Sequence, residues 1–174
     1  LQSQLRERGF KDSAAGDDGA PVCAMNLDNL RVDFMPDDES ILGFSNRWYS
    51  DAITASTQYT LDDSLSINLV TPVYFLATKL EAYKGRGKGD ALGSRDIEDL
   101  LNLVDGRPEL LTEFQGAEPG VQSYIADEIG RLLRDSNFEY AVSSQAGNSN
   151  KREELLLDRL ETLSGNDSIR GKRQ

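Results

Sequence analysis

Apolar residues recur with two different periods along this chain, and the change comes near residue 70. Before it, short segments alternate, as in Leu65, Ile67 and Leu69, which is typical of a strand with one apolar face. After Pro72, apolar residues recur every three or four positions, which predicts helices. Strands followed by a series of helices indicate an α+β fold with segregated elements rather than alternating βαβ units.

Two antiparallel hairpins are predicted in the first part of the chain. Residues 22–25 and 30–35 flank Asn26–Asn29, which predicts a four-residue loop. A second hairpin joins 59–61 to 65–70. The other elements predicted here are a helix end at 1–8 closed by Gly9, a turn-rich loop at 11–20, and a turn followed by a helix within 41–57.

Helices dominate the prediction for the rest of the chain. The predicted ranges are 72–83, 94–104, 108–115 and 119–135, bounded by glycine-containing turns. The polar stretch Ser143–Asn150 indicates a linker, and 155–163 is one short amphipathic helix. We therefore expect a strand-rich domain at 1–71, a helical domain at 72–142, and a linker with a C-terminal helix and tail at 143–174.

Composition excludes several kinds of site. The chain has no histidine and one cysteine, Cys23. It therefore lacks the residues that a Ser/His/Asp triad, a Cys/His pair or a structural zinc site requires. A metal would have to be a hard ion bound by oxygen. The net charge of −11 argues against coating of nucleic acid by the whole surface. No apolar run approaches the roughly 18 residues of a membrane span, so we expect a cytoplasmic protein with no membrane partner.

Asp33 is a carboxylate within the apolar stretch Val32-Asp33-Phe34. One interpretation places it on the solvent face of a half-buried hairpin. The other makes it a metal ligand, since aspartate is depleted in strands and a carboxylate on a rigid strand suits a hard divalent cation. The sequence leaves both open.

Lys79 lies beside the predicted core face of a helix, formed by Val73, Leu76, Ala77 and Leu80. It is either a lysine whose stem covers apolar surface or an ammonium that meets a phosphate. The stretch from Lys79 to Arg95, which includes Arg86, carries five basic and two acidic side chains. It is the basic stretch of an otherwise acidic core, and we expect an anion to dock there.

Asp96 and Asp99 are three residues apart and share a face of the predicted helix after Ser94. Acidic residues in a first turn are favoured by the helix dipole alone, so these two also have a purely structural interpretation.

Four stretches together resemble the AbiEii-like nucleotidyltransferases, which belong to the DNA polymerase β superfamily. They are Arg31–Pro36, Leu42–Tyr49, Leu76–Ala82 with its Lys-Leu-x-Ala, and Ser94–Leu100 with its Asp-x-x-Asp-Leu. The resemblance covers residues 1 to about 142. It implies that the strands are the end of a mixed nucleotidyltransferase sheet and that the helices form a C-terminal bundle.

The resemblance also implies roles for individual residues. Asp33 corresponds to the third metal-binding carboxylate, Lys79 to the lysine that contacts nucleotide phosphates, and Asp96 or Asp99 to the acid of the last motif. Arg86 is expected to help bind the nucleotide. The implied cofactor is Mg²⁺, in a two-metal arrangement, with a nucleoside triphosphate as substrate and a tRNA or a protein as candidate acceptor. An antitoxin or a second subunit is a candidate partner, since toxin–antitoxin pairs occur in this family.

The Gly-Ser turn followed by an Asp-x-Asp strand, which comes first in that family, does not occur in this sequence. The adjacent pairs Asp17-Asp18 and Asp37-Asp38 do not replace it, because adjacent side chains diverge. We therefore expect an N-terminally truncated part of a nucleotidyltransferase. The alternative is a catalytically inactive relative that acts as a binding module, and a third interpretation is an α+β domain without a small-molecule site.

Overall fold

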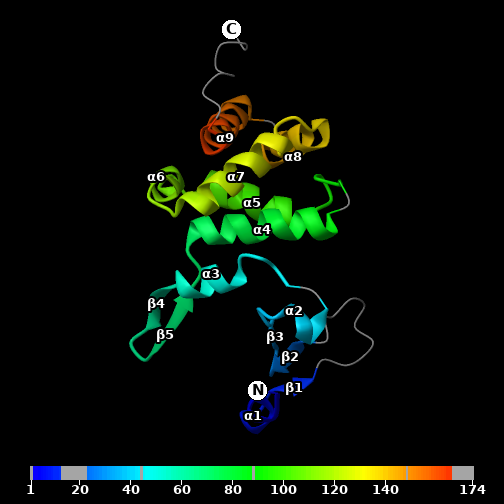
Figure 1. Ribbon diagram of the computed structural model, residues 1–174, viewed down its shortest axis with the longest axis vertical. Coiled ribbons are helices and arrows are strands. Elements are labelled where there is room, and N and C mark those ends of the chain that lie inside the picture. Colours follow the sequence, from blue (N-terminus) through cyan, green and yellow to red (C-terminus); the bar gives the residue numbers. More distant parts are fainter. Residues whose placement is uncertain (1, 13–22, 44, 88, 148, 166–174) are drawn as a thin grey trace. The chain divides into compact units, whose positions relative to one another are not determined.

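The computed structural model describes residues 2–12, 23–43, 45–87, 89–147 and 149–165 (Figure 1). Contacts within the chain divide it into two compact units, Leu1–Ser45 and Asn46–Gln174. The domain boundaries expected at residues 71 and 142 stay predictions.

A three-stranded antiparallel sheet forms the centre of the first unit, with strand order β1-β2-β3. Its buried residues include Leu5, Cys23 and Met25, and the rings of Phe10 and Phe34 pack edge to face with centroids 5.4 Å apart. The elements of this unit are α1 (Gln2–Glu7), β1 (Lys11–Asp12), β2 (Ala24–Leu27), β3 (Leu30–Asp33) and α2 (Glu39–Leu42).

The first predicted hairpin is confirmed, but its loop is shorter than expected. Leu27 pairs with Leu30, so only Asp28 and Asn29 connect β2 and β3. Asp28 has a φ of +52°, the left-handed conformation that a two-residue hairpin turn requires and that aspartate tolerates. The start of the loop predicted at 11–20 pairs instead as β1, and Asp17 and Asp18 lie outside the described residues.

The second unit has a two-stranded hairpin followed by packed helices. Its elements are α3 (Tyr49–Thr54), β4 (Thr57–Asp62), β5 (Leu65–Leu69), α4 (Pro72–Arg86), α5 (Arg95–Gly106), α6 (Leu110–Gln115), α7 (Pro119–Leu132), α8 (Ser136–Ala146) and α9 (Asn150–Leu163). The second hairpin and the change from strands to helices at Pro72 are confirmed. The chain is therefore α+β, and the origin of its sheets in a nucleotidyltransferase sheet stays a prediction.

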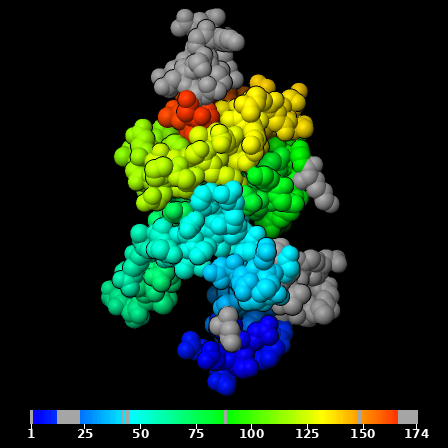
Figure 2. Space-filling model, viewed as in Figure 1, coloured from blue at the N-terminus to red at the C-terminus, as the bar shows by residue number. Residues whose placement is uncertain are grey.

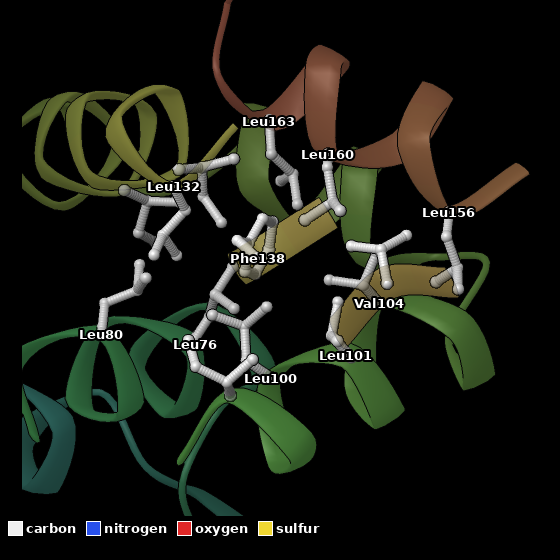
Figure 3. Packing of buried hydrophobic residues seen from close by; sticks show 14 of the residues in the cluster. Leu76, Leu80, Leu100, Leu101, Val104, Leu132, Phe138, Leu156, Leu160 and Leu163 are labelled. Atoms are coloured by element: carbon white, nitrogen blue, oxygen red, sulfur yellow. The ribbon is translucent and has the colours of Figure 1, made fainter. Parts of the chain in front are cut away.

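One hydrophobic core joins the helices α4 to α9. Figure 3 shows labelled side chains of α4, α5, α7, α8 and α9 converging, with Phe138 of α8 lying between Leu76 of α4 and Leu160 of α9. Leu76, Leu100, Leu156, Leu160 and Leu163 have no exposed surface. The core face predicted for α4 is confirmed, since its buried residues are Val73, Leu76, Ala77 and Leu80. This core holds α4 and α5 side by side.

The C-terminal region differs from the sequence prediction. Most of the linker expected at Ser143–Asn150 is helical, because α8 continues to Ala146 and α9 begins at Asn150. Gly147, with a φ of +60°, ends α8 in the left-handed conformation. The polar composition of this stretch reflects the exposed side of α8, whose other side buries Phe138 and Val142. Among the described residues, no helix is long and apolar enough to cross a membrane.

Candidate functional site

Four charged side chains predicted from the sequence meet between α4 and α5. Lys79 and Arg86 come from α4, and Asp96 and Asp99 come from the first turn and a half of α5. We call these four residues the Lys79 cluster. The sequence spacing allows this meeting, because residues 79 and 86 are seven apart on one side of α4 and residues 96 and 99 share a side of α5.

Asp96 is the buried member of the Lys79 cluster, with 3% of its surface exposed. Arg86 donates two hydrogen bonds to Asp96, from Nε to Oδ2 at 2.9 Å and from Nη2 to Oδ1 at 2.8 Å. The Nζ atom of Lys79 lies 3.6 Å from the same Oδ1. Burial acts to raise the pKa of Asp96, but the hydrogen bonds and charge of Arg86, together with Lys79, outweigh it and hold that pKa below its ordinary value. Asp96 is therefore a buried, ionised anchor for two cations.

Asp99 is the half-exposed partner of Lys79. Lys79 donates a hydrogen bond from Nζ to Oδ2 of Asp99 at 2.5 Å. The side chain of Asp99 is 43% exposed, whereas that of Lys79 is 23% exposed. The ammonium of Lys79 also lies 5.4 Å from the centre of the Phe75 ring. Lys79 thus has one buried and one half-exposed carboxylate beside it, and it lies on a helix that the core holds in place.

The purely structural interpretation of the two aspartates accounts for only part of this geometry. A helix dipole favours an acid in the first turn wherever its side chain points. It does not require the acid to be buried, or to be held by an arginine from another helix, as Asp96 is by Arg86. Ser94 is the N-cap residue of α5, but its side chain makes no capping hydrogen bond.

Asp33 belongs to the other compact unit, so its predicted role beside Lys79 stays untested. It ends β3, is exposed, and accepts a hydrogen bond from Nε of Arg31 at 3.2 Å. Its position agrees with the solvent-face interpretation. Within the described residues there is no group of three or more His, Cys, Asp or Glu that could hold a metal ion. Asp33 as a metal ligand stays a prediction.

Sequence reasoning missed two features around α4. One is Phe75, which lies one helical turn before Lys79 and could have been found from that spacing. The other is a second group of charges on the α4–α7 side, where Glu128 contacts both Lys84 and Arg131. Only the spacing of Glu128 and Arg131 was visible in the sequence, because Lys84 is 44 residues away from Glu128 along the chain.

The arrangement of the Lys79 cluster suits exchange of one anion for another. An incoming phosphate oxygen could replace the exposed carboxylate of Asp99 on Lys79, while Asp96 remains held by Arg86. The side chain of Arg86 is 72% exposed, so its guanidinium is also accessible to an anion. Comparison with known proteins adds nothing to this picture, since no protein-family model, curated protein or solved structure matches the chain.

Proposed function

We propose that this chain is part of a nucleotidyltransferase and that the Lys79 cluster binds the triphosphate of its nucleotide substrate. The observation that supports the proposal best is the convergence of Lys79, Arg86, Asp96 and Asp99 at one place between two rigid helices. Lys79, Asp96 and Asp99 come from two separate motifs, Lys-Leu-x-Ala and Asp-x-x-Asp-Leu, for which the sequence resembles the AbiEii-like nucleotidyltransferases.

The burial of the cluster explains how it could accept a phosphate at low cost. Ion pairs between exposed groups contribute little, about 0–1 kcal/mol, so giving up the contact with the half-exposed Asp99 costs little. Giving up Asp96 would leave a buried carboxylate short of cations, which costs far more. A phosphate is therefore expected to take the place of Asp99 and to leave Asp96 where it is.

In the proposed reaction an acceptor nucleophile attacks the α-phosphorus of the triphosphate. The bond from that phosphorus to the oxygen that bridges to the β-phosphate breaks, pyrophosphate leaves with the electron pair, and the acceptor's proton goes to solvent or a base. Lys79 would offset negative charge on the phosphates, and Asp96 would keep Lys79 and Arg86 oriented. Mg²⁺ enters only as the ion that accompanies the triphosphate, with Asp33 proposed as one of its ligands. The acceptor, a tRNA or a protein, and a partner such as an antitoxin stay predictions.

A transfer assay tests the proposal. The full-length polypeptide encoded by the gene that contains this sequence is incubated with Mg²⁺ and each of the four nucleoside triphosphates labelled at the α-phosphate. Label transfer to RNA and to protein is then measured. We expect Lys79→Ala and Asp33→Asn to reduce transfer by at least about 100-fold, the loss typical of a group that stabilises transition-state charge. Lys84→Ala is the matched control, since Lys84 lies on the same helix and pairs with Glu128.

The same assay separates the proposal from the binding-module alternative. Equal transfer by wild type, Lys79→Ala and Asp33→Asn would show that these residues are not catalytic. If the full-length polypeptide binds the triphosphate through Lys79 but transfers no label, the chain is a catalytically inactive relative that binds nucleotides.

A further inference from the structure

The β4–β5 hairpin has one polar and one apolar face, set by the register of its strands. Thr60 pairs with Ser66, and their hydroxyl oxygens lie 3.3 Å apart on the polar face. Tyr59 pairs with Ile67 on the opposite face. The apolar side chains of the hairpin and their exposed fractions are Tyr59 53%, Leu61 54%, Leu65 50%, Ile67 38% and Leu69 42%.

Such a face is usually covered. Two strands alone are at best marginally stable in water, and an alternating strand normally buries its apolar side. In the part of the second unit that the structure describes, no further strand extends this two-stranded sheet. Figure 2 shows the hairpin as the sea-green lobe that extends away from the helices of its own unit.

A hollow of about 710 Å³ continues the apolar face toward the helices. Tyr59 and Leu69 line it from the hairpin, and Val73 and Tyr74 line it from the start of α4. The segment between α6 and α7, including Ala117 and Glu118, forms the other side. We call Tyr59, Leu65, Ile67, Leu69 and Tyr74 the docking face, because together they form one strip from the hairpin to the helices.

Two acidic side chains lie at the hollow: Glu118 lines it, and Asp51 is close enough to Tyr74 in its wall to act on that hydroxyl. Glu118 and Asp51 are both exposed, and neither makes an ion pair within the described residues. Both act on Tyr74, since burial first and then the charges of Asp51 and Glu118 raise the pKa of its hydroxyl. The cation in the wall, Arg107, is already neutralised by Glu113, with an Nη2 to Oε1 distance of 2.6 Å. Among the residues that line the hollow, the charge left without an ion pair is therefore that of Glu118.

We propose that the docking face binds a segment of another polypeptide that carries alternating or clustered apolar side chains flanked by lysine or arginine. Apolar side chains of that segment would cover Ile67 and Leu69 and enter the hollow, and its basic residue would lie beside Asp51 and Glu118. Such a segment matches both the apolar strip and the unpaired carboxylates at its rim.

Two other occupants fit less well. A small apolar molecule would fill the hollow but would leave the exposed strip of the hairpin uncovered. A second copy of the chain would bring the same acidic rim and a net charge of −11 toward itself, which disfavours association. The proposal is independent of the proposed nucleotidyl transfer.

A displayed library of random twelve-residue peptides tests this inference on the chain itself. We expect selection on the wild-type chain to enrich peptides with several apolar residues and an excess of lysine and arginine over aspartate and glutamate. Binding of an enriched, fluorescently labelled peptide is then measured by anisotropy. Asp51→Lys/Glu118→Lys should weaken this binding by at least about tenfold, through loss of attraction and added repulsion.

Two further variants keep the test specific. Asp127→Lys/Glu154→Lys makes the same change in net charge at exposed positions on α7 and α9, and should change the affinity by less than about twofold. Ile67→Thr/Leu69→Thr keeps residues that favour strands, so the hairpin should persist by circular dichroism while binding is lost. Absence of enrichment, enriched peptides without a basic excess, unchanged binding by the Asp51→Lys/Glu118→Lys variant, or self-association that involves this face in sedimentation would each overturn the proposal.

Discussion

Helix α4 contributes one lysine to each of two charged groups. In each group a lysine and an arginine pair with the same carboxylate, and the two carboxylates differ in how deeply they are buried. On the α5 side, Lys79 and Arg86 share Asp96, whose side chain is 4% exposed. On the α7 side, Lys84 and Arg131 share Glu128, whose side chain is 13% exposed. Both cations of the second group contact the same oxygen, Oε1, at 3.1 and 2.6 Å.

The groups also differ in how many carboxylates pair with the lysine. Lys79 has a second, half-exposed partner in Asp99, whereas the only carboxylate that pairs with Lys84 within the described residues is Glu128. A phosphate can displace Asp99 without leaving a buried charge unpaired, but a phosphate on Lys84 would have to compete with Glu128 directly. We therefore propose that similar charged residues on one helix form an exchangeable anion site beside α5 and a closed structural contact beside α7.

The largest difference should appear when each arginine is removed. Arg86→Met leaves the buried carboxylate of Asp96 with only Lys79 at 3.6 Å, and should lower the free energy of unfolding by about 1–3 kcal/mol. Arg131→Met leaves Glu128 with Lys84 at a more exposed position, and should cost less than about 1 kcal/mol. Urea unfolding followed by circular dichroism measures both. Equal losses would contradict the difference in burial.

Asp96 should also give the second unit a specific dependence on pH. Because its pKa is lower in the folded state than the ordinary value of 3.8, the ionised form stabilises the fold at neutral pH. This stabilisation is lost as the pH falls below 3.8 toward the folded-state pKa. Wild type should therefore exceed Asp96→Asn in unfolding free energy at pH 7, and the gap should narrow as the pH falls below 3.8. A gap that stays constant down to that acid range would contradict the ionised anchor.

A smaller effect is expected at Asp99. Asp99→Asn removes a half-exposed contact and should change the free energy of unfolding by less than about 1 kcal/mol. The same substitution frees Lys79 from a competing carboxylate, so it should strengthen binding of inorganic tripolyphosphate in calorimetry. Asp127→Asn makes the same charge change at an exposed position on α7 and should have less effect. Weaker binding by Asp99→Asn would argue against exchange at Lys79.

Local patterns predicted much of the fold. The period of apolar residues placed the core face of α4, and the alternation at Leu65, Ile67 and Leu69 placed β5. The predicted loop at Asn26–Asn29 was wrong in length, because the left-handed conformation of Asp28 allows a two-residue turn that the letters alone did not show. The helix that reaches Ala146 was missed because its exposed side carries polar residues such as Ser136, Asn137 and Ser144.

The candidate site was predicted as a set of residues but not as an arrangement. Spacing placed Asp96 and Asp99 on one side of a helix, yet it did not show which would be buried, since that depends on how α4 packs against α5. Arg86 was expected to contact a nucleotide, and its hydrogen bonds to Asp96 depend on the same packing. Contacts between residues distant in the chain, such as that of Lys84 with Glu128, leave no local pattern to detect.

The most direct test of the phosphate site compares the two lysines of α4. Binding of inorganic tripolyphosphate to the chain is measured by isothermal titration calorimetry for wild type, Lys79→Met and Lys84→Met. Lys79→Met should weaken binding by at least about tenfold, and Lys84→Met by less than about threefold, since each removes one positive charge but only Lys79 exchanges its partner. Equal effects of the two substitutions, or binding that survives Lys79→Met unchanged, would contradict the assignment of the phosphate site to the Lys79 cluster.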